Sequence, residues 1–512
     1  MKNRLKLLLA AIAALTIIAS CTNQGRNKLP NTSVTTKNGE LKGTVNENGT
    51  IAIFKGVPYA APPVGSLRWR EPQPAASWEG VRYASVFGAN AIQVNNRRLP
   101  WTDEYMIPDG TNEDCLFLNI WTPAASSTEN LPVMVWIHGG GLREGSGSVA
   151  VYDGEELAKK GIVVVTINYR VGVLGFLAHP WLTAESANKA SGNYGFLDQV
   201  AALNWVKENI AAFGGNPQKV TIAGQSAGSR SVHMLTASPL AKGLFSGAAA
   251  FSGASIGRLT GVKSLTESEE AGVKFVESKG AKSLEELRAM KPEDLISDFS
   301  ITIDGWFLPD APVDIFKNGM QNDVPVIAGL VADESSSSEG YGNTTKDEFI
   351  KKAQETYGPK ADGFLSLYPV NSDQDAGLMS IEASREKGRF DLYEWAKFRE
   401  TTAKTPAFTY YFERGIPWPE HPEFGAHHTS DVTYWFKNMK KLDRPWTDAD
   451  SLFAENVSSY LVNFVKSGDP NSEGLPKWPV FEGSKNETLN LGLDIHVIPV
   501  TSKDKLDFFE IK

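Results

Sequence analysis

A five-residue turn constrains the fold of this 512-residue chain more than any other stretch of its sequence. Residues 224–228 read Gly-Gln-Ser-Ala-Gly, the Gly-x-Ser-x-Gly pattern in which small residues flank a serine. An apolar run typical of a buried strand, 220–223, precedes this turn, and a helical pattern, 229–237, follows it. A strand, a sharp turn and a helix in that order predict a nucleophile elbow with Ser226 exposed at its tip. The pattern also arises by chance as a glycine-rich turn with an incidental serine, so the flanking strand and helix carry the interpretation.

Strands and helices alternate along most of the chain. A helical pattern occupies 196–209, where Val200 and Leu203 share an apolar face. The alternation predicts an α/β fold, a mostly parallel central sheet flanked by helices, with active residues at the carboxyl ends of the strands. The segment 255–405 is more irregular and charged, and we expect it to form helical insertions that cover the site. Short apolar runs typical of buried strands lie at 133–137, 162–167, 220–223, 324–330 and 408–412.

A glycine-rich loop follows the predicted strand 133–137. It reads His-Gly-Gly-Gly at 138–141, and glycines leave the backbone N–H groups uncovered. We expect the N–H groups of Gly140, Gly141 and Ala227 to surround a developing oxyanion. The histidine that opens the loop is expected to shape it rather than to carry a proton.

Several further runs are specific enough to indicate a family. With the elbow and the glycine loop, they make the chain similar to the type B carboxylesterases of the α/β-hydrolase fold, which include the cholinesterases. The resemblance covers nearly all of the chain beyond the first 33 residues. It implies a serine hydrolase that cleaves small-molecule carboxylic esters through an acyl-enzyme, without a metal or cofactor. The runs are Phe-Lys-Gly-Val-Pro-Tyr-Ala at 54–60, Pro-Pro-Val-Gly-Ser-Leu-Arg-Trp at 62–69, Asn-Glu-Asp-Cys-Leu-Phe-Leu-Asn at 112–119, Gly-Asn-Tyr-Gly-Phe-Leu-Asp-Gln at 192–199 and Ala-Ala-Phe-Gly-Gly-Asn-Pro at 211–217.

The resemblance also implies a catalytic triad in the chain order serine, acid, histidine. Ser226 takes the role of nucleophile. Glu334 follows a predicted strand and takes the role of the acid, although the glycine usual after it is a serine here, and Asp333 is the rival. His428 matches the family histidine in Gly-Ala-His-His-Thr-Ser-Asp, and a slip of one residue would exchange it with His427.

The family pattern implies other features of structure. Cys115 lacks its usual partner, because alanine stands where an upstream cysteine is expected, so we expect a buried, unpaired thiol rather than a reactive one. The resemblance further implies two structural ion pairs, Arg68 with Glu113 and Arg170 with Asp198.

The residue before the nucleophile bears on which substrates the protein prefers. Many family members have glutamate there, whereas this chain has Gln225, which removes a negative charge. We therefore expect a neutral or acyl-selective ester substrate rather than a choline ester. Leu142, Trp306, Phe307 and Leu308 either line an acyl pocket or belong to the core.

Two alternative functions use the same fold. One is an amidase or peptidase with the same triad, and the other is a non-catalytic binding protein that has lost catalytic residues. All the expected catalytic parts are present, which favours an enzyme. With 51 basic and 60 acidic side chains the net charge is -9, so binding to nucleic acid is not expected.

The N-terminus predicts export. Basic residues at the start precede an apolar run, 7–18, that is too short to span a membrane. The sequence Ile-Ala-Ser-Cys that ends at Cys21 resembles a bacterial lipobox, in which the cysteine is lipidated; a plain secreted protein is the alternative. We expect a signal peptide at 1–20, a flexible tether at 21–33 and one α/β-hydrolase domain at 34–512, held in the bacterial cell envelope only through the lipid.

Overall fold

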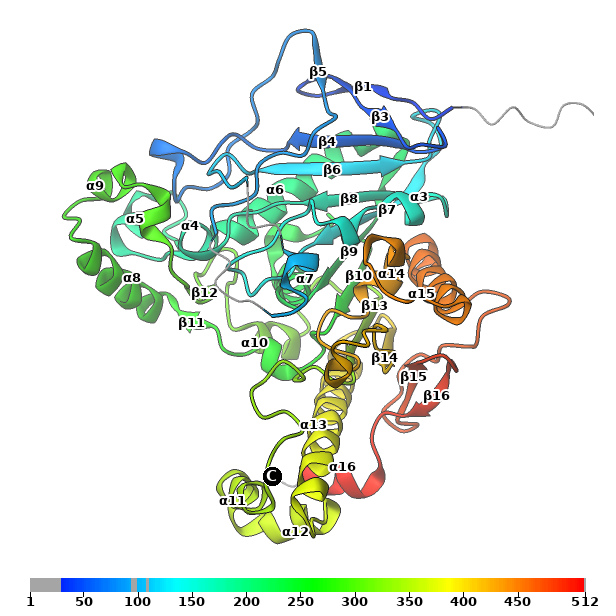
Figure 1. Cartoon of the computed structure of the whole chain (residues 1–512). Coiled ribbons are helices and arrows are strands. Elements are labelled where there is room, and N and C mark those ends of the chain that lie inside the picture. The colour runs from blue at the N-terminus through cyan, green and yellow to red at the C-terminus, as the bar shows by residue number, and fades with distance from the viewer. Residues whose placement is uncertain (1–28, 94–98, 107–109, 511–512) are drawn as a thin grey trace, which may run out of the picture.

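The computed structural model of the chain describes residues 29–93, 99–106 and 110–510 (Figure 1). The expected signal peptide 1–20 and the expected lipidation site Cys21 lie outside the described residues. Within the described ranges no helix combines the length and the apolar character needed to cross a bilayer.

The centre of the described protein is an eleven-stranded sheet. Its strands are β3 Thr44–Val45, β4 Ala52–Pro58, β6 Phe117–Thr122, β7 Leu131–Ile137, β8 Val163–Ile167, β9 Gly215–Gln225, β10 Gly247–Phe251, β13 Val326–Val331, β14 Ala407–Phe412, β15 Glu487–Leu491 and β16 His496–Pro499. Their order across the sheet is β16-β15-β14-β13-β10-β9-β7-β8-β6-β4-β3. Every neighbouring pair from β15 to β8 is parallel, and antiparallel strands lie only at the two margins. The mostly parallel sheet expected from the sequence is therefore present.

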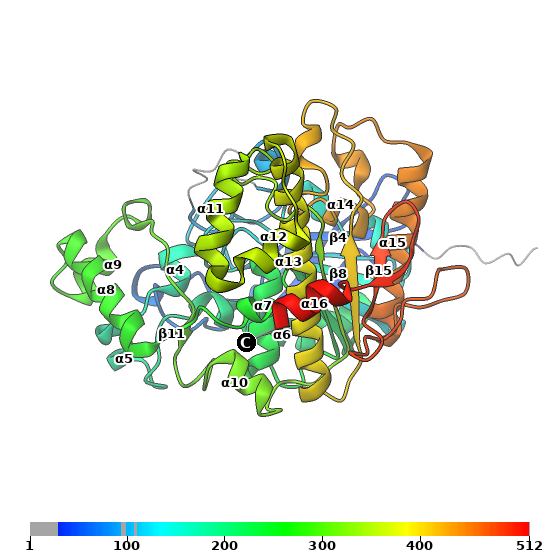
Figure 2. The ribbon, with the colours of Figure 1, turned by 90° about the horizontal axis from the view of Figure 1, so that it is seen from below.

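Helices cover both faces of this sheet. α6 and α7 lie on one side and α15 on the other, as the view in Figure 2 shows. Strands covered on both faces are buried along their whole length, which explains why β8 reads Val-Val-Val-Thr-Ile without a polar face. The helices are α2 Thr102–Tyr105, α3 Glu155–Ala158, α4 Gly172–Phe176, α5 Pro180–Glu185, α6 Tyr194–Asn209, α7 Ala227–Ala237, α8 Leu265–Lys279, α9 Leu284–Ala289, α10 Pro312–Lys317, α11 Lys346–Tyr357, α12 Ala361–Leu367, α13 Asp373–Thr402, α14 Val432–Trp435, α15 Asp448–Ser467 and α16 Lys503–Glu510.

The segment 255–405 forms helices, and α13 is the longest of those described. The 30-residue helix α13 packs against β13 and β14 and reaches the region of their carboxyl ends. α11, α12 and α16 gather at the far end of α13, where they share a small apolar core with Phe349, Phe364 and Tyr368 (Figure 1). Of these helices, α13 is the one that contributes side chains to the site described next.

Short strands complete the described structure. β1 Ser33–Thr36, β2 Gly39–Lys42 and β5 Val81–Tyr83 form one small sheet, and β11 Lys263–Ser264 pairs with β12 Thr302–Ile303.

Candidate active site

The turn between β9 and α7 has the geometry of a nucleophile elbow. Ser226 has φ 58° and ψ -118°, a conformation that a non-glycine residue adopts only when its surroundings enforce it. Its N–H donates to the carbonyl of Phe251 on the neighbouring strand at 3.0 Å. Gly228 explains the second glycine of the motif, since a Cβ there would lie 2.0 Å from the carbonyl oxygen of Ile137. The serine therefore stands at the tip of a tight strand-to-helix turn.

Three of the residues singled out by sequence meet at this tip. The Nε2 atom of His428 lies 2.8 Å from Oγ of Ser226, and its Nδ1 atom lies 2.5 Å from Oε2 of Glu334. Ser226 and His428 are 202 positions apart in the chain. They meet because Ser226 follows β9, Glu334 follows β13, and His428 lies in the connection after β14, all at the carboxyl edge of the parallel sheet.

Glu334 is held as a carboxylate directed at the imidazole. Burial alone would raise its pKa, but the charge and hydrogen bond of His428 outweigh burial and bring the pKa below its usual value. The hydroxyl of Ser252 and the N–H of Val331 also donate to it, the latter at 3.1 Å. An ionised Glu334 favours the tautomer in which Nδ1 of His428 carries the proton, which leaves Nε2 free to accept the proton of the serine hydroxyl.

Asp333, the rival to Glu334, has a different set of partners. Its Oδ2 accepts the N–H of Ala426 at 2.9 Å, and its Oδ1 accepts the hydroxyl of Tyr341 and Nε of Arg385, each at 2.8 Å. It is 5% exposed. Asp333 therefore ties the loop of the acid to the loop of the histidine and to α13, and it does not hydrogen-bond to the imidazole.

The neighbouring histidines also have partners of their own. His427 is stacked on Trp101 with ring centroids 4.3 Å apart, its Nδ1 contacts the carbonyl of His428 at 2.9 Å, and burial lowers its pKa to about 4. His138 is stacked on Tyr169, and burial likewise lowers its pKa to about 4. Both rings are buried and stay neutral near pH 7, which fits packing roles for them.

The glycine loop lies against the elbow. A Cβ on Gly139 would come 3.1 Å from Cβ of Ser226. Gly140 has φ +100°, and its carbonyl accepts the N–H groups of Arg143 and Glu144, which closes the loop. Within the described ranges the N–H groups of Gly140 and Gly141 have no hydrogen-bond partner. The N–H of Ala227, at the first position of α7, has no intrahelical acceptor either.

Two contacts of the imidazole and its acid could not be read from the sequence. Nε2 of Gln225 lies 3.2 Å from Nε2 of His428, so this side chain contacts the imidazole directly. Ser252, which donates to Glu334, follows β10. The position of Ser252 directly after a strand adjacent to β9 could have indicated a site residue. The strand itself, Gly-Ala-Ala-Ala-Phe, contains no β-branched residue and was not predicted.

A second buried acid lies three residues after His428, in the turn that precedes α14. Asp431 is fully buried and accepts the hydroxyl of Tyr410 at 2.9 Å and Nε1 of Trp435 at 3.1 Å. Burial raises its pKa to about 6, and the negative charge of Glu334 adds to that effect.

The structural features implied by the family pattern are confirmed. Arg68 holds Glu113 through two hydrogen bonds of 2.6 Å, and Arg170 holds Asp198 through bonds of 2.8 and 2.7 Å. Cys115 is a buried free thiol, and burial raises its pKa.

The residues expected either to line an acyl pocket or to belong to the core are found to pack in the core. Phe307 and Leu308 are fully buried, and the ring of Phe307 stacks on that of Phe196 at 5.1 Å. Leu142 is also buried. Trp306 is partly buried and packs against the same core.

Among the described residues, two cavities near the site bear on substrate binding. The first, the His428 cavity, has a volume of about 540 Å³ and lies between α13 and the loops that follow β10 and β13. Its wall includes Trp101, Gly253, Glu334, Ser335, Lys387 and His428.

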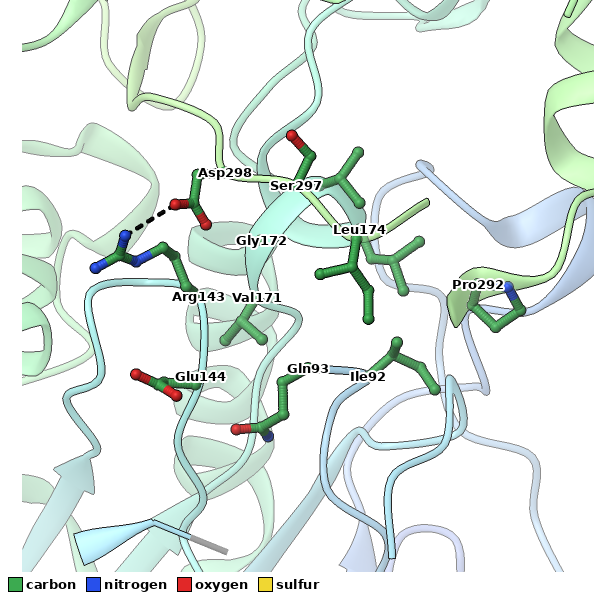
Figure 3. Close-up of a pocket in the computed structure, with 12 residues that line it drawn as sticks. Ile92, Gln93, Arg143, Glu144, Val171, Gly172, Leu174, Pro292, Ser297 and Asp298 are labelled. Atoms are coloured by element: carbon green, nitrogen blue, oxygen red, sulfur yellow. Dashed lines mark hydrogen bonds and ion pairs between the residues drawn. The ribbon is translucent and has the colours of Figure 1, made fainter. Parts of the chain in front are cut away.

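The second, the Arg143 cavity, has a volume of about 500 Å³ and lies beyond the glycine loop. Figure 3 shows Arg143 paired with Asp298 on one side and the apolar side chains of Ile92, Leu174 and Pro292 on the other. Nη1 of Arg143 lies 2.8 Å from Oδ2 of Asp298. The described residues contain no group of three side chains placed to hold a metal ion.

Comparison with known proteins agrees with this architecture. The model of the carboxylesterase family matches residues 30–377 and 389–509. The chain is 35% identical over 480 residues to the fumonisin B1 esterase of Sphingopyxis macrogoltabida, covering 90% of this chain and 86% of that protein. It is 35% identical over 502 residues to the para-nitrobenzyl esterase of Bacillus subtilis (strain 168), covering 91% and 95%. A solved structure of a PNB esterase superposes with a TM-score of 0.78 at 30% identity, covering 93% of this chain and 99% of that one. The chain therefore belongs to the carboxylesterase family and is a carboxylic ester hydrolase with the α/β-hydrolase fold.

Proposed function

We propose that the protein cleaves small-molecule esters through an acyl-enzyme on Ser226, with His428 as the base, Glu334 as its orienting acid, and the N–H groups of Gly140, Gly141 and Ala227 as the oxyanion hole. The observation that carries this proposal is the continuous hydrogen-bonded series from the serine hydroxyl through the imidazole to the carboxylate. The N–H groups of Gly140 and Gly141, which have no partner among the described residues, support it.

The chemistry follows from the weakness of a serine hydroxyl as a nucleophile. His428 takes the hydroxyl proton as Ser226 attacks the ester carbonyl, and Glu334 stabilises the imidazolium that forms without itself being protonated. The N–H groups of the glycine loop bind the oxyanion. His428 then gives the proton to the departing alcohol, and water enters by the same route to release the acid.

The arrangement favours catalysis over the binding-only alternative. A binding protein has no need of a strained serine aligned with an imidazole at hydrogen-bond distance, and that strain costs stability. Amide or peptide cleavage uses the same triad, and the esterase family favours esters over it.

We further propose that the preferred esters are neutral. Gln225 is 1% exposed and uncharged, and it touches His428 where a carboxylate would attract a cation. The comparison of a choline ester with its neutral, carbon-for-nitrogen analogue tests this: the account predicts faster turnover of the neutral ester, and equal turnover of the two would refute it.

The test of the catalytic assignment is hydrolysis of a panel of aryl, alkyl, acetylated-sugar and feruloyl esters by the purified protein and its Ser226→Ala variant. Loss of the nucleophile should reduce kcat by up to about a million-fold. Ser338→Ala, an exposed serine in the turn after Glu334, is the matched control and should keep wild-type rates. Unchanged rates in Ser226→Ala would contradict the assignment.

We also propose, on sequence grounds alone, that the protein is exported and anchored in the bacterial envelope by lipid on Cys21. The support is the basic start, the short apolar run and the lipobox-like residues that end at this cysteine. Cells that express the chain and are fed labelled palmitate should incorporate label into the wild-type protein and none into Cys21→Ser. Equal labelling of both, or of neither, would contradict the anchor.

A further inference from the structure

The wall of the His428 cavity combines apolar side chains with several serine side chains. Ligand pockets are lined mainly by apolar and aromatic side chains with a few polar groups. Here serine residues come from three separate parts of the chain: the loop after β10, the turn after β13 and helix α13. Those serines are Ser252, Ser255, Ser335, Ser337 and Ser384.

Most of these hydroxyl groups form no hydrogen bond with other described residues. Ser252 donates to Glu334 and so serves the triad. Over the described ranges, the other hydroxyl groups of the wall form no hydrogen bond with protein atoms. Each of them can both donate and accept, so together they offer hydrogen bonds in both senses to a ligand.

The charges of the wall balance one another. Arg385 pairs with Asp333 at 2.7 Å, and Lys387 forms an ion pair with Asp391 on the next turn of α13. Among the described residues of the wall, each cationic side chain therefore has a carboxylate partner, and the remaining carboxylate, Glu334, pairs with His428. The apolar side chains that line the cavity include Trp101 and Leu330.

The position of His428 indicates which part of an ester enters this cavity. In the proposed mechanism its Nε2 atom delivers a proton to the departing alcohol, so the alcohol oxygen must lie beside the imidazole. His428 and Glu334 line the His428 cavity and do not line the Arg143 cavity. The alcohol part of the substrate therefore extends toward the serine hydroxyl groups.

We propose that the His428 cavity binds a neutral, polyhydroxylated alcohol, so that the preferred substrates are esters of a sugar or a similar polyol. This inference rests on the proposed function of the triad. A polyol can form hydrogen bonds with the serine hydroxyl groups and pack its C–H face against the apolar side chains of Trp101 and Leu330. An alkyl chain in the same place would strip water from those hydroxyl groups and return no hydrogen bonds, which disfavours it.

The experiment compares two acetate esters of the same shape. Methyl glucoside 6-acetate and cyclohexylmethyl acetate both carry the acetyl group on a CH₂–O attached to a six-membered ring, and only the first has ring hydroxyl groups. We expect kcat/KM of the full-length protein to be at least about ten-fold higher for the sugar ester. Ser337→Ala and Ser384→Ala should each lower the ratio of the two kcat/KM values by about three- to ten-fold. Ser338→Ala, which changes an exposed serine outside the cavity wall, should leave the ratio unchanged.

Phenyl acetate separates failure of this inference from failure of the proposed function. If the protein hydrolyses phenyl acetate but handles the sugar ester no better than the cyclohexyl ester, the polyol assignment is overturned and the triad is retained. The same conclusion follows if the cavity variants leave the ratio unchanged. If phenyl acetate and the other esters are not hydrolysed at all, the proposed function itself fails.

Discussion

Replacing Asp431 by asparagine should stabilise the protein at high pH relative to low pH. This carboxyl is fully buried, and burial raises its pKa from an ordinary 3.8 to about 6. The folded protein therefore holds this proton more tightly than the unfolded chain does. Below the pKa that this carboxyl has in the unfolded chain, its ionisation does not lower the free energy of unfolding. As the pH rises through the pKa that it has in the folded protein, the free energy of unfolding falls. Asparagine cannot ionise, so the variant escapes that loss and still offers an oxygen to Tyr410.

The size of the effect follows from the two pKa values. A buried carboxyl with a pKa of about 6 instead of 3.8 costs the folded state about 3 kcal/mol at pH 8, at 1.36 kcal/mol per pH unit. At pH 4.5, where the folded carboxyl is protonated and the unfolded one is partly so, the cost is about 1 kcal/mol. The difference in unfolding free energy between Asp431→Asn and wild type should therefore shift by about 2 kcal/mol in favour of the variant between these pH values.

The assay is urea unfolding of both proteins at pH 4.5, 6 and 8, followed by tryptophan fluorescence. Asp450→Asn is the matched control. Burial opposes its ionisation, but hydrogen bonds from Thr447 and Arg414 bring the pKa of Asp450 below its usual value, so it stays charged across this range. Its effect on stability should be the same at pH 6 and pH 8. A pH-independent effect of Asp431→Asn would refute the assignment of a raised pKa to this acid.

Three further predictions follow from packing and positioning. Asp198→Asn removes the charge partner of the buried Arg170 and should cost about 3–5 kcal/mol of stability, seen as a lower Tm; an unchanged Tm would contradict the role given to this pair. Gly228→Ala places a Cβ 2.0 Å from a carbonyl oxygen and should abolish esterase activity in whatever protein folds, whereas wild-type kcat would contradict a tight elbow. Asp333→Ala removes the hydrogen bond that joins the loop of Glu334 to the loop of His428, and it should lower kcat by about ten- to hundred-fold with little change in KM. Asp333→Asn should keep part of this activity, because asparagine still accepts the N–H of Ala426. Equal rates in Asp333→Ala and wild type would exclude a positioning role.

Much of the fold was predictable because its central strands are continuous apolar runs. β7 and β8 are rich in β-branched residues and are buried on both faces, which is the pattern of a parallel strand. β10 escaped prediction because alanine also favours helices, and only packing against α7 and β9 makes this run a strand. The elbow was predictable because a strand, a turn and a helix are adjacent in sequence.

The residues of the site also differ in how far the sequence predicts them. Ser226, Glu334 and His428 each lie in a local motif, so a sequence comparison can align them. The partners of those residues are distant in sequence, as with Gln225 and His428, which are 203 positions apart. Such contacts depend on strand order and loop packing, which no local pattern encodes. For the same reason the choice between Glu334 and Asp333 rested on alignment, whereas the hydrogen bonds of each carboxylate distinguish them.

The central claim, an acyl-enzyme on Ser226, is tested most directly by trapping that intermediate. The purified protein is mixed with 4-nitrophenyl acetate, quenched in acid within milliseconds and digested for peptide mass spectrometry, while nitrophenol release is followed in parallel. The account predicts a burst of about one nitrophenol per protein and an acetyl group on Ser226, with neither in Ser226→Ala. An acetyl group on another residue, or steady turnover with no acylated peptide in a protein whose Ser226→Ala variant remains active, would contradict it.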